Sequence, residues 1–219
     1  MHKYRMLFKK TGRAIYISHL DLMRVMQRTF MRAGYQLKYS EGFNPHPQIS
    51  ILLPLSVGCS SQSELMDFQI IGDEDISEMP ARLTAVMPEG IEALSVYETE
   101  SKVKNLKYLR IGGVFEYDER DCAEMQEKLT EFFSRESIVI EKKTKRGMGE
   151  SDIKPAISEI SFAAGEGVVR LEAVISAQEP TLNPEHLVSA LRQLAPELAP
   201  DFAEFIRLEV FDEKMEIFR

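Results

Sequence analysis

The stretch YISHLDLMRVMQRTFMRAGYQLKYSEGFNPHPQISILLP, from Tyr16 to Pro54, determines the order of elements in the first half of the chain. Ser18, followed three residues later by Asp21, is typical of a capped helix start, and the helix dipole favours a carboxylate in the first turn. Gly34 lies where a helix commonly ends in a left-handed turn. We therefore expect a strand end, a helix, a stiff loop and a returning strand.

The predicted helix has two unlike faces when its residues are placed at intervals of about 100°. One broad face consists of Leu22, Val25, Met26, Thr29, Phe30 and Ala33. Arg24, Arg28 and Arg32 fall on the opposite face, with Asp21 among them. Such an arginine face is most often simply solvated, with the apolar face packed on a sheet. The alternative is a phosphate-binding row, because guanidinium groups contact phosphate in a bidentate manner.

The loop YSEGFNPHP, Tyr39–Pro47, is stiffer and more polar than an ordinary connection, because each of its two prolines restricts its own φ and the residue before it. The hydrogen-bonding and aromatic groups of this loop belong to Ser40, Phe43, Asn44 and His46. A stiff loop with these groups suits an unstacked nucleobase. Alternatively, it is a stiff turn whose Phe43 fills the core. Residues expected to support the cap and the loop are Ser18, His19, Asp21, Gly42, Pro45 and Pro47.

Composition limits the classes of protein that this chain can represent. With 219 residues, 44% of them hydrophobic, it can bury one large core or two ordinary ones. A net charge of -8 argues against a general nucleic-acid coat protein. Residues 1–47, however, hold nine basic side chains against two acidic ones, a net of +7, which leaves -15 for the remainder. This distribution lets a protein present one positive patch to a polyanion.

Cysteine usage and hydropathy indicate the compartment. Cys59 and Cys122 stand alone, so neither a disulfide framework nor a CxxC metal pair is expected. No apolar run approaches the roughly 18 residues that cross a bilayer, and the first residues do not resemble a signal peptide. We expect a cytoplasmic protein without membrane attachment, metal or cofactor.

The order of the predicted elements indicates an α+β fold of two tandem ferredoxin-like (βαββαβ) domains. The first, residues 1–100, contains strands at 3–9, 48–53, 64–71 and 91–99, an extended piece at 14–17, and helices after Ser18 and at 76–87. The second, residues 106–219, contains strands at 106–117, 137–144, 168–176 and 205–211 and helices at 121–135 and 184–194. The connection 145–164 is expected to include an extended arm.

A second basic cluster lies in the second half of the chain and consists of Lys142, Lys143, Lys145 and Arg146. One interpretation is a solvated, mobile hairpin tip. The other is a flexible arm that contacts a phosphate backbone, helped by Gly147 and Gly149, which let the chain approach closely.

Several enzyme classes lack their motifs in this chain. GxxxxGK[ST], GxGxxG, HExxH and GxSxG are absent, as is the CxxxCxxC run that holds the cluster of a radical S-adenosylmethionine enzyme. His19 and His46 are a candidate pair for metal-independent RNA cleavage by general acid–base catalysis. Histidines more often hydrogen-bond the backbone and shape a loop, so we assign no catalytic residue.

The pattern SHLD at Ser18–Asp21, the arginines Arg24, Arg28 and Arg32 with Ala33-Gly34, and YSEGFNPHP resemble a bacterial family of unknown function, the radical-SAM-linked (radical-SAM-associated) proteins. The resemblance covers the whole chain, and Asp152-Ile153-Lys154-Pro155 looks like a further segment of that family. It implies a partner, a radical S-adenosylmethionine protein, more than a reaction.

The first domain is also similar, more distantly, to the tandem ferredoxin-like RNA-processing proteins of CRISPR systems. Those proteins place RNA along a basic groove and carry a glycine-rich C-terminal loop. Residues 213–219 of this chain, EKMEIFR, contain no glycine, which argues against a cleavage activity of that kind.

These observations lead to one principal hypothesis and two alternatives. The principal hypothesis is a non-catalytic RNA-binding module that presents tRNA or rRNA to a radical S-adenosylmethionine enzyme of RNA modification, with no DNA or membrane partner. Its expected contacts are Arg24, Arg28, Arg32, Ser40, Phe43, Asn44, His46, Lys143, Lys145 and Arg146. The alternatives are an endoribonuclease that uses His19 and His46, and a purely protein-binding subunit.

Overall fold

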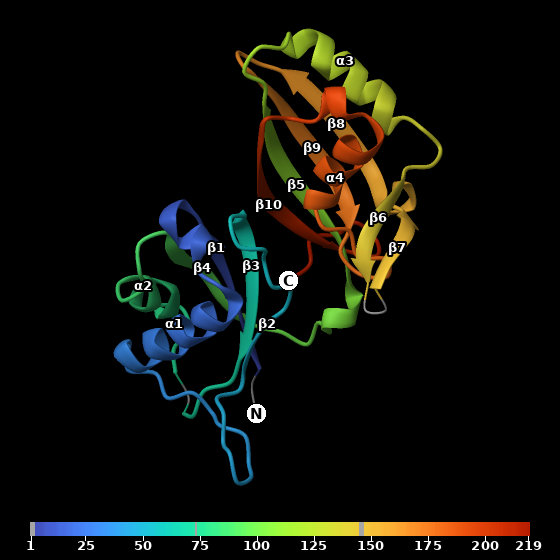
Figure 1. Cartoon of the computed structure of the whole chain (residues 1–219). Coiled ribbons are helices and arrows are strands. Elements are labelled where there is room, and N and C mark those ends of the chain that lie inside the picture. Colours follow the sequence, from blue (N-terminus) through green and yellow to red (C-terminus); the bar gives the residue numbers. More distant parts are fainter. Residues whose placement is uncertain (1–2, 73, 145–146) are drawn as a thin grey trace. The chain divides into compact units, whose positions relative to one another are not determined.

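The computed structural model describes residues 3–72, 74–144 and 147–219, and the chain forms two compact units, Met1–Val103 together with Arg219, and Lys104–Phe218 (Figure 1). The elements of the first unit are β1 (Tyr4–Lys10), the 3-10 helix η1 (Gly12–Tyr16), α1 (His19–Arg32), β2 (Ile49–Ile51), β3 (Ser60–Phe68), α2 (Met79–Thr84) and β4 (Ile91–Glu98). A short 3-10 turn, η2 (Val103–Asn105), follows β4.

The first unit has a sheet of order β4-β1-β3-β2 in which every neighbouring pair is antiparallel. α1 and α2 cover one face of this sheet (Figure 1). Alternate residues of β1 point into the core, where they meet the apolar faces of both helices. The largest fully buried apolar side chains of this core are Met6, Phe8, Met26, Phe30, Met66, Phe68 and Met79. The unit is ferredoxin-like, which confirms the predicted fold class.

Two local predictions in the first unit are wrong. Residues 14–17, expected to be extended, belong mostly to η1, because Gly12 adopts φ +54° and the N–H of Ala14 then bonds the Thr11 carbonyl at 3.2 Å. The helix expected at 76–87 is shorter, since α2 spans Met79–Thr84. Before it, the Ser77 N–H donates to the Asp75 carboxylate at 2.9 Å, which forms a turn in place of a first helical turn.

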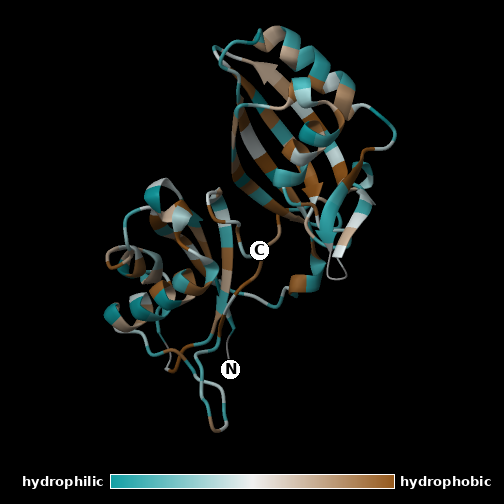
Figure 2. Ribbon diagram, in the orientation of Figure 1, coloured by the Kyte–Doolittle hydropathy of each residue, from teal (hydrophilic) through white to brown (hydrophobic). Residues whose placement is uncertain are grey.

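The second unit is built in the same way around a larger sheet. Its elements are β5 (Leu106–Glu116), α3 (Cys122–Phe133), β6 (Val139–Thr144), β7 (Gly147–Asp152), η3 (Lys154–Ala156), β8 (Ile157–Ala164), β9 (Val168–Ser176), α4 (Glu185–Leu194), η4 (Pro196–Leu198) and β10 (Phe202–Asp212). Its strands pair in the antiparallel order β10-β5-β9-β8. Apolar residues are concentrated on these strands (Figure 2). With the β6–β7 hairpin set aside, the order is again βαββαβ, so the second unit is also ferredoxin-like.

The prediction that residues 137–144 supply a strand of the second sheet is wrong. That segment contains β6, whose one partner among the described strands is β7, in a register from Val139 opposite Asp152 to Thr144 opposite Gly147. The place next to β9 is taken by β8, from the connection that was expected to hold an extended arm. The physical reason is a tight turn at Gly165–Val168, which makes β8 the immediate hairpin partner of β9.

Candidate functional site

α1 begins with a closed hydrogen-bond network around its N-cap. The Asp21 N–H donates to Ser18 Oγ at 3.2 Å, and the Ser18 hydroxyl donates to Asp21 Oδ2 at 2.7 Å. Arg24 Nη1 donates to Asp21 Oδ1 at 2.8 Å. The hydrogen bond from Ser18, and then the one from Arg24, hold the pKa of Asp21 below its ordinary value. The network fixes the start of the helix and engages one of the three arginines.

The end of α1 is defined as closely as its start. Gly34 adopts φ +83°, the Gly34 N–H donates to Met31 O at 3.1 Å, and the Tyr35 N–H donates to Phe30 O at 2.9 Å. This is the Schellman arrangement, with its usual apolar contact, because the rings of Phe30 and Tyr35 meet edge to face at 6.4 Å between centroids. The chain therefore leaves the helix in one fixed direction.

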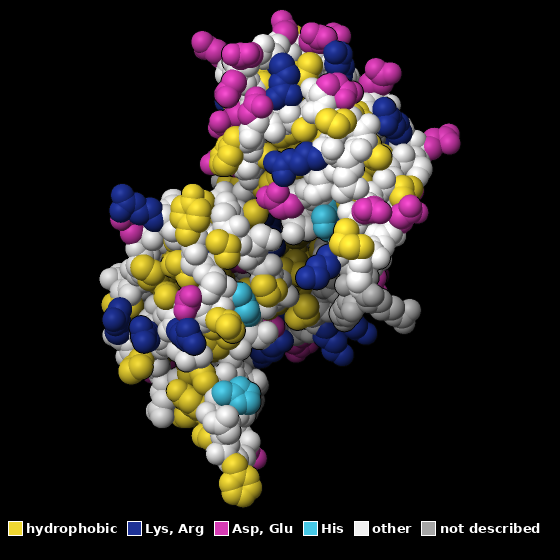
Figure 3. Space-filling model, viewed as in Figure 1, with side chains coloured by type: hydrophobic (Ala, Val, Ile, Leu, Met, Phe, Trp, Pro, Cys, Tyr) yellow, Lys and Arg dark blue, Asp and Glu magenta, His cyan; other side chains and the backbone are white. Residues whose placement is uncertain are grey.

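The arginine face of α1 is open to solvent. Arg24, Arg28 and Arg32 are all exposed, and Figure 3 shows basic side chains in a row along this helix. Neighbours in the row are four residues apart, about 6 Å along the axis. Arg28 and Arg32 form no hydrogen bond or ion pair with any other described residue, whereas Arg24 is paired with Asp21. Two guanidinium groups are thus available to an anion.

Residues 36–48, between α1 and β2, form a two-sided arm that projects from the first unit (Figure 1). The Gln48 N–H donates to Lys38 O at 2.7 Å, and Tyr39 and Pro47 form an antiparallel bridge. At the base, the Lys38 N–H donates to Gln69 O at 2.8 Å, which ties the arm to the chain just after β3. Backbone hydrogen bonds therefore define the course of the arm, in addition to its prolines.

The tip of the arm is closed by Ser40 and His46. The Ser40 N–H donates to His46 O at 2.9 Å, the His46 N–H donates to Ser40 Oγ at 3.1 Å, and Ser40 Oγ is hydrogen-bonded with His46 Nδ1 at 2.9 Å. Residues 41–46 are exposed, and Phe43 is completely so, which shows that the alternative in which Phe43 fills the core is wrong. Gly42 adopts φ +121°, which only glycine adopts readily. The tip thus presents an aromatic ring beside the polar groups of Asn44 and His46.

The imidazole rings of His19 and His46 have different surroundings. His19 lies in the first turn of α1, and its Nδ1 is buried without a hydrogen-bond partner. His46 Nδ1 is engaged with Ser40 on the arm. No hydrogen bond between the two imidazoles occurs in the described part of the chain. His46 instead shapes the loop that carries it.

The second basic cluster is only partly described. Lys143 is exposed on β6, whereas Lys145 and Arg146 lie outside the described residues. Lys154, further along, has a structural contact: its Nζ donates to Phe133 O at 2.6 Å, at the C-terminus of α3. A lysine in this position satisfies a terminal helix carbonyl and interacts favourably with the helix dipole.

Two residues that support the site were missed from the sequence. Lys10 is buried at the end of β1, and its Nζ donates to the carbonyls of Ile15 at 3.2 Å and Ile17 at 2.9 Å, which curls the chain just before the N-cap of α1. Its burial lowers the pKa of this lysine. Strand alternation places Lys10 on the same side as Phe8, so a signal for its burial was present.

Arg82, on α2, is the other supporting residue. Its Nη2 donates to Ala33 O at 2.8 Å, and its guanidinium lies over the Tyr35 ring at 4.5 Å from the centroid. It therefore caps α1 from 49 positions away in sequence, which no local pattern predicts. Tyr39, an exposed aromatic residue on the arm itself, was also not chosen as a candidate.

Two other features, a metal site and a membrane-spanning helix, are not found among the described residues. Within 3–72, 74–144 and 147–219, no three His, Cys, Asp or Glu side chains converge in a way that could hold a metal ion. In the same ranges, no helix combines the length and the apolar character that crossing a membrane requires.

The sequence matches a family model described as "Uncharacterized protein conserved in bacteria (DUF2344)" over residues 3–184. The chain belongs to the DUF2344 family. The matched region includes α1 with its arginines, the arm and the β6–β7 hairpin. No curated protein matches the sequence.

The comparison with solved structures gives information on the fold of this DUF2344 chain. A chain of the Cbf5–Nop10–Gar1 complex aligns with 96% of it at a TM-score of 0.54 and 10% identity. The DUF2344 chain spans only 50% of that neighbour, and at this identity the likeness shows the fold alone. A protein of unknown function from Galdieria sulphuraria (10% identity, TM-score 0.26) aligns over 94% of this chain and 98% of its own. Thermus thermophilus Cse3 bound to an RNA representing a pre-cleavage complex (13% identity, TM-score 0.21) aligns over 94% of this chain and 99% of its own. The TM-scores of 0.26 and 0.21 are too low to support an argument from these two structures.

Proposed function

We propose that this DUF2344 protein is an RNA-binding module that presents tRNA or rRNA to a radical S-adenosylmethionine enzyme and is not itself a catalyst. The observation that carries the proposal is the arm, whose tip exposes Phe43 completely while hydrogen bonds between Ser40 and His46 hold the backbone around it. An aromatic side chain held out on an ordered loop is unusual, because apolar rings are normally buried or packed against neighbours.

The chemistry of the tip suits a single unpaired nucleotide. The Phe43 ring offers a stacking surface for a base, and the exposed Asn44 amide can both donate to and accept from a base edge. Because stacking is sequence-tolerant and amide hydrogen bonds are not, the two groups together provide affinity and some selectivity.

The arginine face of α1 supplies the contacts to the RNA backbone in this proposal. Arg28 and Arg32 are free to form bidentate hydrogen bonds to phosphate, and Arg24 contributes less because it is already paired with Asp21. Lys143 and, beyond the described residues, Lys145 and Arg146 would add further phosphate contacts.

The partner enzyme follows from the resemblance to radical-SAM-linked proteins and from what the sequence lacks. Residues 1–219 contain no CxxxCxxC run, so these residues do not themselves hold the iron–sulfur cluster of such an enzyme. A module that binds RNA but carries no catalytic motif fits the role of presenting a substrate.

The test is fluorescence anisotropy of the full chain with labelled small RNA across a salt series. The variant Arg24→Ala/Arg28→Ala/Arg32→Ala removes the row, and Arg170→Ala/Arg192→Ala/Lys214→Ala removes the same charge from exposed sites in the second unit. Each phosphate contact contributes about 0.7 to the slope of log affinity against log salt for single strands. We expect the arginine variant to lower that slope by about 1.4 to 2, with the smaller value if Arg24 contributes little, and the control variant to leave it unchanged.

Three outcomes would contradict the proposal. An equal loss of affinity in both triple variants would mean that RNA binding depends only on the net charge of the protein. Association with a partner enzyme without any RNA binding would favour the purely protein-binding alternative. Cleavage of the RNA, abolished by His19→Ala or by His46→Ala, would favour the endoribonuclease.

A further inference from the structure

β8 is the outermost strand of the second unit's sheet. It pairs with β9 along one edge, and no described strand of this unit pairs with its other edge. Exposed strand edges carry unpaired backbone groups that can join another chain, and proteins normally protect them. The groups that cover the outer edge of β8, and the length of edge that they leave uncovered, therefore indicate what this edge can bind.

The hairpin turn determines which backbone groups of β8 point outward. The Gly165 N–H donates to Val168 O at 2.8 Å, so these two residues form a hydrogen-bonded pair of the antiparallel ladder. Bonded and non-bonded pairs alternate along such a ladder. Ala164, Phe162 and Ile160 consequently direct their N–H and C=O groups away from β9.

One of these outward groups is already occupied within the unit. The Ala164 N–H donates to the Gln126 side-chain oxygen of α3 at 3.1 Å, which agrees with the alternation. Toward the start of the strand, the ladder is irregular between Ile157 and Glu159. The regular part of the edge that is not covered is therefore short and centred on Ile160 and Phe162.

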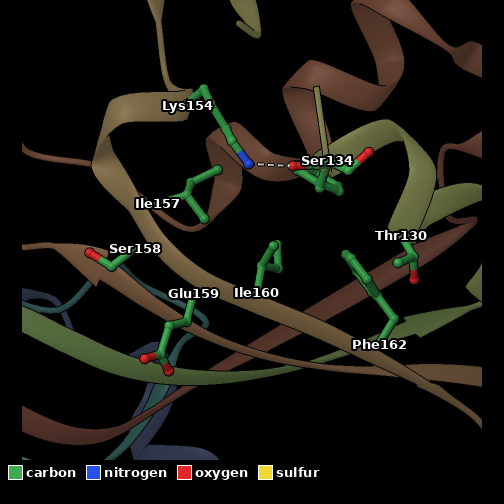
Figure 4. A pocket seen from close by; sticks show the side chains of 9 residues that line it. Thr130, Ser134, Lys154, Ile157, Ser158, Glu159, Ile160 and Phe162 are labelled. Carbon is green, nitrogen blue, oxygen red and sulfur yellow. Dashed lines mark hydrogen bonds between the residues drawn. The ribbon is translucent and has the colours of Figure 1, made fainter. Parts of the chain in front are cut away.

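A pocket of about 410 Å³ lies beside this part of the edge, between β8 and the end of α3 (Figure 4). Its apolar lining comes from Phe133, Ile157, Ile160 and Phe162, and the rings of Phe133 and Phe162 stack at 5.5 Å between centroids. Figure 4 shows Lys154 reaching across one side to the end of α3, where its Nζ bonds Phe133 O. Ile160 and Phe162, which have outward backbone groups, thus also contribute to the apolar part of the pocket lining.

The surroundings of the pocket are acidic. Glu159 lines it from β8. Glu127 and Glu131 lie exposed on α3, each three residues before a lining residue of the pocket, Thr130 and Ser134 respectively, and so next to it on the helix surface. Lys154 is the one cation of the described lining, and its charge is directed at a helix C-terminus. A second copy of β8 would bring like charges together, whereas a basic segment would meet opposite charges.

We propose that the free edge of β8 and the adjoining pocket bind an extended basic segment of a partner protein. The segment adds to the sheet as a short antiparallel or parallel strand through the backbone groups of Ile160 and Phe162. It places one apolar side chain in the pocket and pairs its flanking lysine or arginine residues with Glu127, Glu131 and Glu159. This binding does not depend on RNA binding by the first unit.

The test uses the full chain and the labelled peptide Lys-Thr-Val-Leu-Val-Thr-Lys, together with a peptide in which Asp replaces Leu and one in which Glu replaces both Lys residues. Ile160→Pro removes one outward N–H while leaving the bonds to β9, because proline is tolerated at edge positions that face away from the ladder. We expect the basic peptide alone to bind, with about tenfold weaker affinity for Ile160→Pro. Binding should also slow hydrogen exchange at the amides of Ile160 and Phe162.

A charge reversal keeps the proposal testable if Ile160→Pro does not fold. Glu127→Lys/Glu131→Lys is expected to reverse the preference from the basic to the acidic peptide, whereas Glu213→Lys/Glu216→Lys, also exposed in the second unit, is expected to leave it unchanged. The proposal is overturned if no peptide binds, if basic and acidic peptides bind equally, or if the two charge-reversal variants behave alike.

Discussion

Replacing Phe43 with alanine is expected to separate RNA binding from stability. The ring is completely exposed, and no aromatic or cation–π contact involves it in the described structure. Substitutions at such exposed positions usually change the free energy of unfolding by no more than about 0.5 kcal/mol. The melting temperature of Phe43→Ala should therefore equal that of the wild type.

The effect on RNA binding should be large by comparison. Loss of one base–aromatic stack by alanine substitution costs about 1–3 kcal/mol, which corresponds to roughly 5- to 150-fold in affinity. Because the ring carries no charge, the slope of log affinity against log salt should not change, in contrast to the arginine variant. Phe43→Trp should retain wild-type affinity, because it preserves the stacking surface.

Anisotropy with labelled single-stranded RNA at several salt concentrations measures the affinity and the slope of log affinity against log salt. Thermal denaturation followed by circular dichroism measures stability. Unchanged affinity in Phe43→Ala would refute the role of the tip in binding a base. A clear drop in melting temperature would refute the structural premise, because it would mean that the ring packs against the protein.

Three further changes test the support of the site and the second unit. Gly34→Ala places a side chain at φ +83°, which should cost about 1–2 kcal/mol of unfolding free energy in urea titrations; no loss would contradict the left-handed helix end. Ser40→Ala removes the hydroxyl that bonds His46, so it should weaken RNA binding while the melting temperature stays almost unchanged. An unchanged affinity for RNA would contradict the role of this hydroxyl in holding the tip. Burial raises the pKa of Tyr117 from 10.0 to about 12, and its hydroxyl donates to Leu198 O at 2.8 Å. This contribution to stability is complete below pH 10 and is lost as the pH rises toward 12, so Tyr117→Phe should flatten the alkaline loss seen in denaturant titrations.

The limits of α1 were predictable because their signals are local. Ser18 and Asp21 satisfy helix N–H groups within one turn, and Gly34 is the residue that a left-handed helix end favours. The βαββαβ order was predictable for a similar reason, since hydrophobic periodicity reports the face that each element buries. Residues 14–17 and 76–78 were mistaken because side-chain and turn hydrogen bonds there override the apolar pattern.

The candidate site was only partly accessible from the sequence. The arginine row follows from helical spacing alone, and so did its exposure once the opposite face was identified as apolar. The position of Phe43 did not follow, because an aromatic residue in a loop can equally fill a core or face solvent. The support from Arg82 comes from another helix and has no local signal.

Sequence by itself thus determined the fold class, the limits of α1 and the approximate positions of most other helices and strands, because propensity, capping and periodicity act over a few neighbouring residues. Tertiary structure decided which strands meet. β6 and β8 both have strand-forming sequences, but only the strand joined to β9 by the turn at Gly165 enters the sheet, while β6 pairs with β7 outside it. This pairing leaves one edge of β8 and its pocket open, since β9 occupies the other edge and no described strand of the second unit continues the sheet beyond β8.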